Sequence, residues 1–172
     1  MSWTRAIKSH WPFFLFSLAV YITGFGLGIG IAYNKKATIH PQKMAFVPTS
    51  IHNLEVVLVL VIGGILTFGI FNTLFLGYNA LMLGMTVKSV WDKYGAAPLV
   101  HGVLPHGLIE IAGTLILNTL GYESYRVLKA LKTDATMDRK TVVHIREVLL
   151  LFSLGVVFIV GAAVIESTIS QA

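Results

Sequence analysis

Long uncharged stretches of apolar residues alternate with short polar segments along this chain and predict an all-α bundle of transmembrane helices. A bilayer core about 30 Å thick needs roughly 20 apolar residues for each helical span. On this basis we expect a single polytopic integral-membrane domain over residues 1–172, with five spans at 11–33, 54–74, 77–92, 98–121 and 148–166. The charged segment 123–146 is expected to form one or two short helices on the membrane surface.

The first apolar stretch follows two basic residues, as a secretory signal peptide does. It is longer than the roughly 7–15 apolar residues of a signal core, and we expect a retained span. Its glycine spacing predicts two helix-packing pairs, Gly24 with Gly28 and Gly26 with Gly30, through which another helix can approach closely. A phosphate-binding loop is not expected, because no strand precedes these glycines and no lysine follows at the required offset.

The uncharged stretch from Val56 to Val87 is too long for one comfortable span and short for two spans with a loop. We expect a tight helical hairpin with its turn between Asn72 and Asn79, and a single long tilted helix is the alternative. Pro105 interrupts the fourth span, and proline suits a first helical turn better than a helix interior. Residues 98–104 are therefore expected to form a half-helix or re-entrant piece, with the main helix beginning near Pro105.

The overall composition supports a membrane protein and excludes several other classes. Hydrophobic residues make up 55% of the 172 residues and charged residues 12%, against about 25% charged in ordinary soluble domains. A soluble globular enzyme and a disordered chain are therefore excluded. The chain has no cysteine, which excludes thiol catalysis, disulfides and thiolate metal sites.

The net charge of +5 is best explained by basic loops that face anionic membrane lipid. Acidic residues are interspersed with the basic ones in segment 123–146, so we do not expect nucleic acid as a partner. The positive-inside rule favours a cytoplasmic N-terminus in the cell membrane. With that orientation the cytoplasmic side carries more basic residues (Arg5, Lys8, Arg126, Lys129, Lys132, Arg139, Lys140 and Arg146) than the outer side (Lys35, Lys36, Lys43, Lys88 and Lys93).

Ionisable residues inside a span are costly and are candidates for function. His106 and Glu110 are four residues apart, which places them one turn apart on one helical face. The five-span topology brings His101, His106, Glu110 and Glu166 toward the outer side of the bundle.

Three interpretations of this polar group remain open. The residues can lock the bundle by hydrogen bonds, or form a catalytic or metal centre with Glu110 as base and His106 as ligand or acid, or line a proton or ion pathway. The His-x-x-x-Glu spacing lacks the two-histidine zinc signature, and we expect no metal or cofactor. Asn72 and Asn79 share a face at seven-residue spacing, and they either hydrogen-bond between helices or line a polar cavity.

Residues 102–111, with a Pro-His-Gly core followed by Glu110, resemble the signature of the stage II sporulation protein M family. The preceding hairpin and the Ala-Ala-Val-Ile ending before Glu166 also fit, so that the resemblance covers about residues 54–170. Thr-Pro often follows that ending in the family, whereas Ser167 and Thr168 follow here. The matching positions draw attention to His106, Glu110 and Glu166.

The resemblance implies a multi-pass bacterial or archaeal membrane protein. Sporulation members of the family are non-enzymatic parts of a complex with a cell-wall hydrolase. Short members similar in size to this chain accompany gene sets for circular bacteriocins, where they are implicated in maturation, export or self-protection.

The leading functional hypothesis is a non-enzymatic integral component that scaffolds a membrane complex or assists maturation or export of a hydrophobic peptide. Its expected partners are membrane lipid, other membrane proteins or a second copy of the chain, and the hydrophobic peptide itself. The alternative is an intramembrane enzyme of the peptide hydrolase or cyclase type that uses His106 and Glu110. A small transporter or ion pathway is the third hypothesis.

Overall fold

The computed structural model describes residues 3–33, 46–133 and 144–169. These residues form helices throughout, and the described ranges contain no β-strand. The helices are α1 (Trp3–Ala32), α2 (Phe46–Leu66), α3 (Ile70–Tyr94), the short π-helix η1 (Leu99–Val103), α4 (Leu104–Leu120), α5 (Glu123–Thr133) and α6 (His144–Ile169). The predicted all-α bundle is therefore confirmed.

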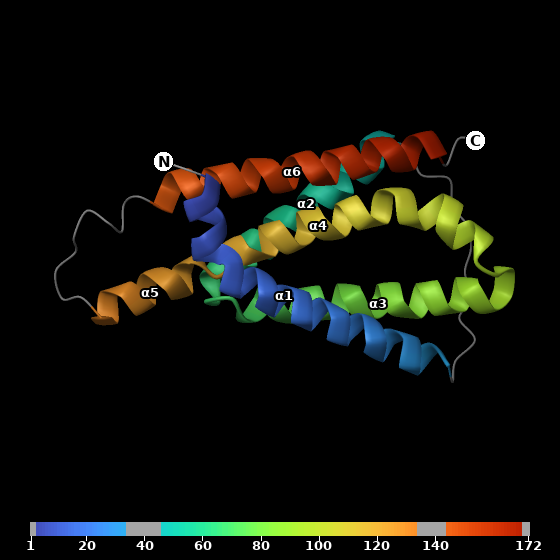
Figure 1. The fold of residues 1–172 in the computed structure, drawn as a ribbon, viewed down its shortest axis with the longest axis horizontal. Helices are drawn as coiled ribbons and strands as arrows, with labels where there is room; N and C mark the ends of the chain where they lie inside the picture. The colour runs from blue at the N-terminus through green and yellow to red at the C-terminus, as the bar shows by residue number, and fades with distance from the viewer. Residues whose placement is uncertain (1–2, 34–45, 134–143, 170–172) are drawn as a thin grey trace.

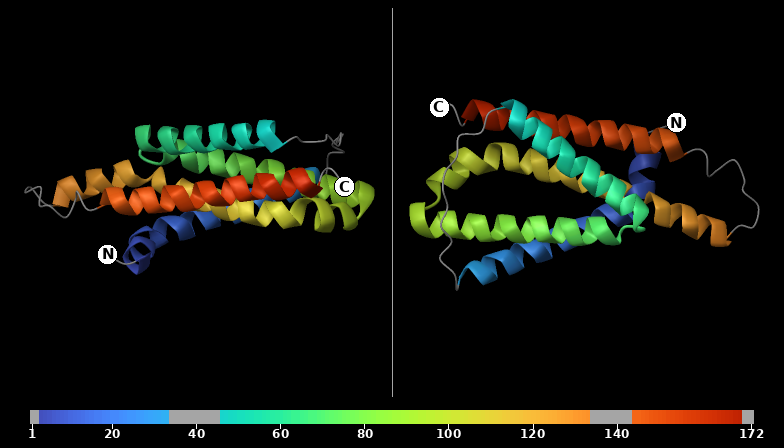
Figure 2. Two further views of the ribbon diagram at one scale, coloured as in Figure 1. Left: turned by 90° about the horizontal axis from the view of Figure 1, so that it is seen from above. Right: turned by 180° about the vertical axis from the view of Figure 1, so that it is seen from behind.

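Two closely packed helix pairs dominate the arrangement. α1 packs mainly on α3, and α4 packs mainly on α6. The two pairs are visible in Figure 1, where α2 passes behind α4 to reach α3. Figure 2 shows that α2 lies on the side of the bundle away from α1, and it contacts α3, α4 and α6. Each of the two tight pairs therefore joins helices that are not consecutive in the sequence.

The five long helices alternate in direction, so α1 begins and α6 finishes at opposite ends of the bundle (Figure 1). We call the end that holds the start of α1, the α2–α3 turn and α5 the hairpin end, and the opposite end the π-helix end. Four helices in the described ranges are long and apolar enough to cross a membrane: His10–Ala32, Ile70–Tyr94, Leu99–Lys129 and Ile145–Thr168. The apolar part of α2 is shorter, Ile51–Leu66, but the whole helix has 21 residues and a length of about 31 Å.

The helical hairpin is present, but the prediction of its turn between Asn72 and Asn79 was wrong. α2 ends at Leu66 and α3 begins at Ile70, so the turn occupies residues 67–69. Phe68 (φ 54°) and Gly69 (φ 93°) both take left-handed backbone conformations, which reverse the chain direction within three residues. The hydroxyl of Thr67 closes the turn, because it donates to the Gly63 carbonyl at 2.7 Å and accepts from the Phe71 amide at 2.9 Å.

The fourth span begins with a short separate piece, η1, and its main helix α4 begins next to Pro105, as the sequence predicted. The N–H of Leu104 donates to the carbonyl of Leu99, five residues earlier, which makes the turn before α4 a π-helical one. Pro105 lies in the first turn of α4, the part of an α-helix where proline is best tolerated. α4 then runs to Leu120 and is separated by only two residues from α5.

The apolar core lies where α2, α4 and α6 meet. It is formed by the buried side chains Val57, Leu117, Leu120, Leu151 and Ile159. α4 and α6 approach closely because each places a glycine in the seam. A Cβ on Gly113 would lie 3.0 Å from the Gly155 carbonyl oxygen, and a Cβ on Gly155 would lie 2.4 Å from the Leu117 side chain. The seam between these two helices therefore depends on the absence of side chains at both positions.

Candidate functional site

Two carboxylates lie on the neighbouring helices α4 and α6, toward the π-helix end. Glu110 lies on α4 and Glu166 on α6, both half-buried, and the two interact electrostatically. The imidazole of His52, on the exposed face of α2, also interacts electrostatically with Glu110. His52 was not among the predicted site residues. It lies in the first part of α2, before the predicted span 54–74. A histidine outside a predicted span was not treated as a candidate for function.

The two predicted histidines lie on either side of the start of α4, His101 in η1 and His106 in the first turn of α4. His106 is half-buried, and its buried Nδ1 has no hydrogen-bond partner among the described residues. His101 is exposed within η1. No three or more histidine, aspartate or glutamate residues in the described ranges are grouped so that they could hold a metal ion. The carboxylates and imidazoles near this end are groups that can accept and release protons.

The deepest polar contacts join three helices near the hairpin end. The side-chain amide of Asn72 on α3 donates to the backbone carbonyl of Asn118 on α4 at 2.7 Å. The side-chain amide of Asn118 then donates to the hydroxyl of Ser17 on α1, also at 2.7 Å. All three side chains are 0% exposed. We call these residues the amide network, and its contacts are interhelical hydrogen bonds.

The amide network shows how the structure uses the two predicted asparagines. Asn72 packs closely between two helix backbones, since a Cβ on Gly64 or Gly121 would come within 2.9 Å or 2.3 Å of its side chain. Its role is therefore that of an interhelical link. Asn79, which was predicted to share a helical face with Asn72, is half-buried on α3.

The predicted glycine pairs behave differently from each other. Gly24 and Gly28 face α3, where added Cβ atoms would lie 2.6 Å from the Gly77 carbonyl oxygen and 2.0 Å from that of Leu81. Gly26 and Gly30 do not make such a contact, because a Cβ at either position meets no heavy atom within 4 Å. A helix presents residues at i and i+4 on one face, so only one of two pairs offset by two residues can face α3.

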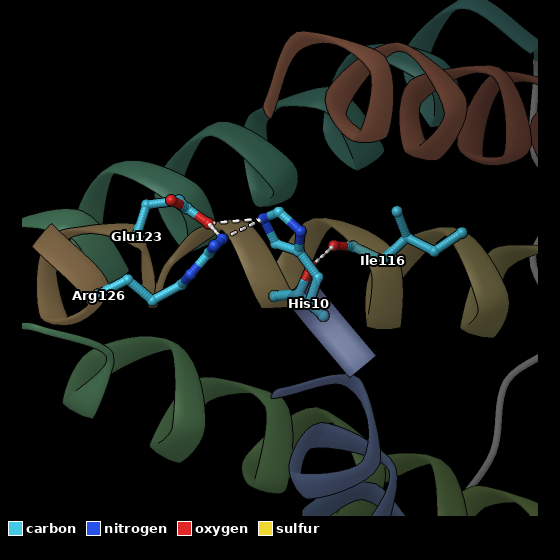
Figure 3. A network of polar contacts seen from close by, with 5 residues as sticks. His10, Ile116, Glu123 and Arg126 are labelled. Carbon is cyan, nitrogen blue, oxygen red and sulfur yellow. Dashed lines mark hydrogen bonds and ion pairs between the residues drawn. The ribbon is translucent and has the colours of Figure 1, made fainter. Parts of the chain in front are cut away.

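A second buried polar cluster connects the start of α1 to α5 (Figure 3). The Nε2 of His10 lies 2.6 Å from Glu123 Oε1 and 2.7 Å from Arg126 Nη1. The guanidinium of Arg126 donates to the same Glu123 oxygen at 2.5 Å. His10 is only 3% exposed. We call these three residues the His10 cluster, and it fixes the base of α5 against α1.

An apolar groove of about 570 Å³ opens beside the α2–α3 turn at the hairpin end. Its walls are the aromatic residues Phe13 and Phe16 of α1, Phe68 of the turn, and Tyr122 and Tyr125 near the start of α5. The ring of Phe13 stacks on Tyr122 with centroids 5.2 Å apart, and the Tyr122 ring meets Phe16 edge-on at 6.0 Å. Gly69 of the α2–α3 turn packs directly against the Tyr122 ring, because an added Cβ at Gly69 would lie only 2.2 Å from that ring.

Comparison with known proteins identifies the family. The family model of stage II sporulation protein M matches residues 13–171, which is most of the chain. The chain belongs to the stage II sporulation protein M family. Together with the apolar helices, this membership makes it a membrane protein of the sporulation-M type. The predicted resemblance began near residue 54, and the match now adds α1 from residue 13 onward.

The chain also resembles one archaeal protein over part of its length. An uncharacterized protein of Methanocaldococcus jannaschii is 30% identical over 105 residues, which cover 59% of this chain and 47% of that protein. The chain thus spans about half the length of this relative. No solved structure matches the chain.

Several buried polar contacts among the described residues of this sporulation-M protein involve side chains that the sequence did not single out. Ser17 and Asn118 were missed because each lies alone in an apolar stretch. A lone asparagine in a span is nevertheless a recognisable signal, since an amide in lipid needs a partner. His10 and Glu123 were missed because both lie at predicted span ends, where polar residues are ordinary.

Proposed function

We propose that this sporulation-M protein is a non-enzymatic integral component that scaffolds a membrane complex. The amide network carries this proposal, because its fully buried polar side chains join α1, α3 and α4 rather than line an open site. Hydrogen bonds of this kind hold helices in one arrangement within lipid. The family's sporulation members, which the sequence resembles, act as non-enzymatic parts of a complex, and this supports the same assignment.

The complex we propose contains other membrane proteins or a second copy of the chain, and it assists the maturation or export of a hydrophobic peptide. We further propose that the hairpin end faces the cytoplasm of the cell. The exposed bases Lys8, Lys129 and Arg146 lie at that end and support this orientation through the positive-inside rule.

A second candidate is an intramembrane enzyme with Glu110 as its base. The electrostatic interaction between Glu110 and Glu166 favours it, because carboxylates that influence each other can hold different protonation states and so divide acid and base roles. The imidazole of His106, one helical turn away, would then serve as acid or ligand.

One experiment separates the two candidates. Tagged wild-type, Glu110→Gln and Asn118→Leu chains are expressed from the native locus of a deletion strain. The size of the detergent-extracted complex and the deletion phenotype are then measured for each. The scaffold predicts that Glu110→Gln keeps both complex and phenotype, and that Asn118→Leu weakens both together.

A Glu110→Gln chain that assembles normally but fails to restore the phenotype would overturn the scaffold in favour of the enzyme. Solute flux through proteoliposomes that contain the purified chain alone would overturn both in favour of a transporter. The neighbouring genes distinguish the two scaffold settings. A peptide precursor with an ATPase supports peptide maturation or export, and a cell-wall hydrolase supports a sporulation role.

A further inference from the structure

We draw no further inference here: the strongest candidate, the apolar groove beside the α2–α3 turn at the hairpin end, is lined mainly by aromatic and aliphatic side chains, and nothing in the structure shows what covers it.

Discussion

Replacing Gly28 by alanine should separate α1 from α3. An added Cβ lies 2.0 Å from the Leu81 carbonyl oxygen and 2.9 Å from its carbon, and the three atoms nearest to it are all backbone atoms, which cannot rotate away. The two helices must move apart by about 1 Å, and a gap of that size forfeits roughly a quarter to a half of each dispersion contact along the seam. We expect Gly28→Ala to reduce the free energy of unfolding by about 2 kcal/mol, within the usual range for overpacking.

Gly26 provides a matched control on the same helix. Its added Cβ meets no heavy atom within 4 Å, so Gly26→Ala leaves the packing unchanged and gains helix propensity. This change is expected to raise the free energy of unfolding by about 0.5–1 kcal/mol. Gly84→Ala places a Cβ 2.2 Å from the Phe25 carbonyl oxygen and should reproduce the loss from the α3 side.

Thermal unfolding in mild detergent, followed by circular dichroism, measures all three variants. A loss of 2 kcal/mol corresponds to a fall of about 4–8 °C in Tm for a chain of this size. Equal shifts for Gly26→Ala and Gly28→Ala would refute the reasoning, because the two changes are chemically identical and differ only in what their Cβ atoms meet.

Three further changes test other parts of the structure. Phe68→Gly and Phe68→Ala both remove the ring, but only glycine accepts the left-handed backbone, so the glycine variant should be more stable by about 1 kcal/mol in detergent unfolding; equal stabilities would contradict the strain at this turn. Glu123→Gln removes the largely buried carboxylate that accepts from Arg126 and should cost about 2 kcal/mol, whereas Lys88→Gln breaks an exposed pair and should cost less than about 1 kcal/mol. Thermal melts of both variants decide this, and equal losses would count against the His10 cluster. Asn118→Leu removes the donor to Ser17 and should cost about 1 kcal/mol, measured by the same melts with the conservative Asn118→Gln for comparison; a leucine variant as stable as wild type would show that the amide network contributes nothing.

Much of the fold could be predicted from the sequence because lipid imposes strong constraints on composition. Uncharged runs marked the helices, and Pro105 marked the start of α4. The position of the hairpin turn could not be read, because the asparagine and glycine residues typical of turns lie inside α3 here. Asn72 lies in α3 since its amide has a partner on α4, and the real turn contains Phe68, which gives no turn signal.

The candidate site was only partly visible for a related reason. Glu110 attracted attention because a carboxylate in an apolar helix is costly, and in the structure it interacts electrostatically with Glu166. Which helix face a neighbour covers depends on tertiary packing, however, and the sequence contains no record of it. This is why Gly26 and Gly30 were predicted alongside Gly24 and Gly28, although only the latter pair meets α3.

The pairing of α1 with α3 and of α4 with α6 also determines how much of the chain must be present before packing is complete. The glycine face of α1 has no backbone to pack against until residues 70–94 have been synthesised, and the Gly113 face of α4 has none until α6 follows. Each tight pair thus closes around an intervening helix of the sequence. A chain truncated before α3 or before α6 retains its hydrophobic spans but lacks half of a seam, so the bundle is completed only when its last helix is in place.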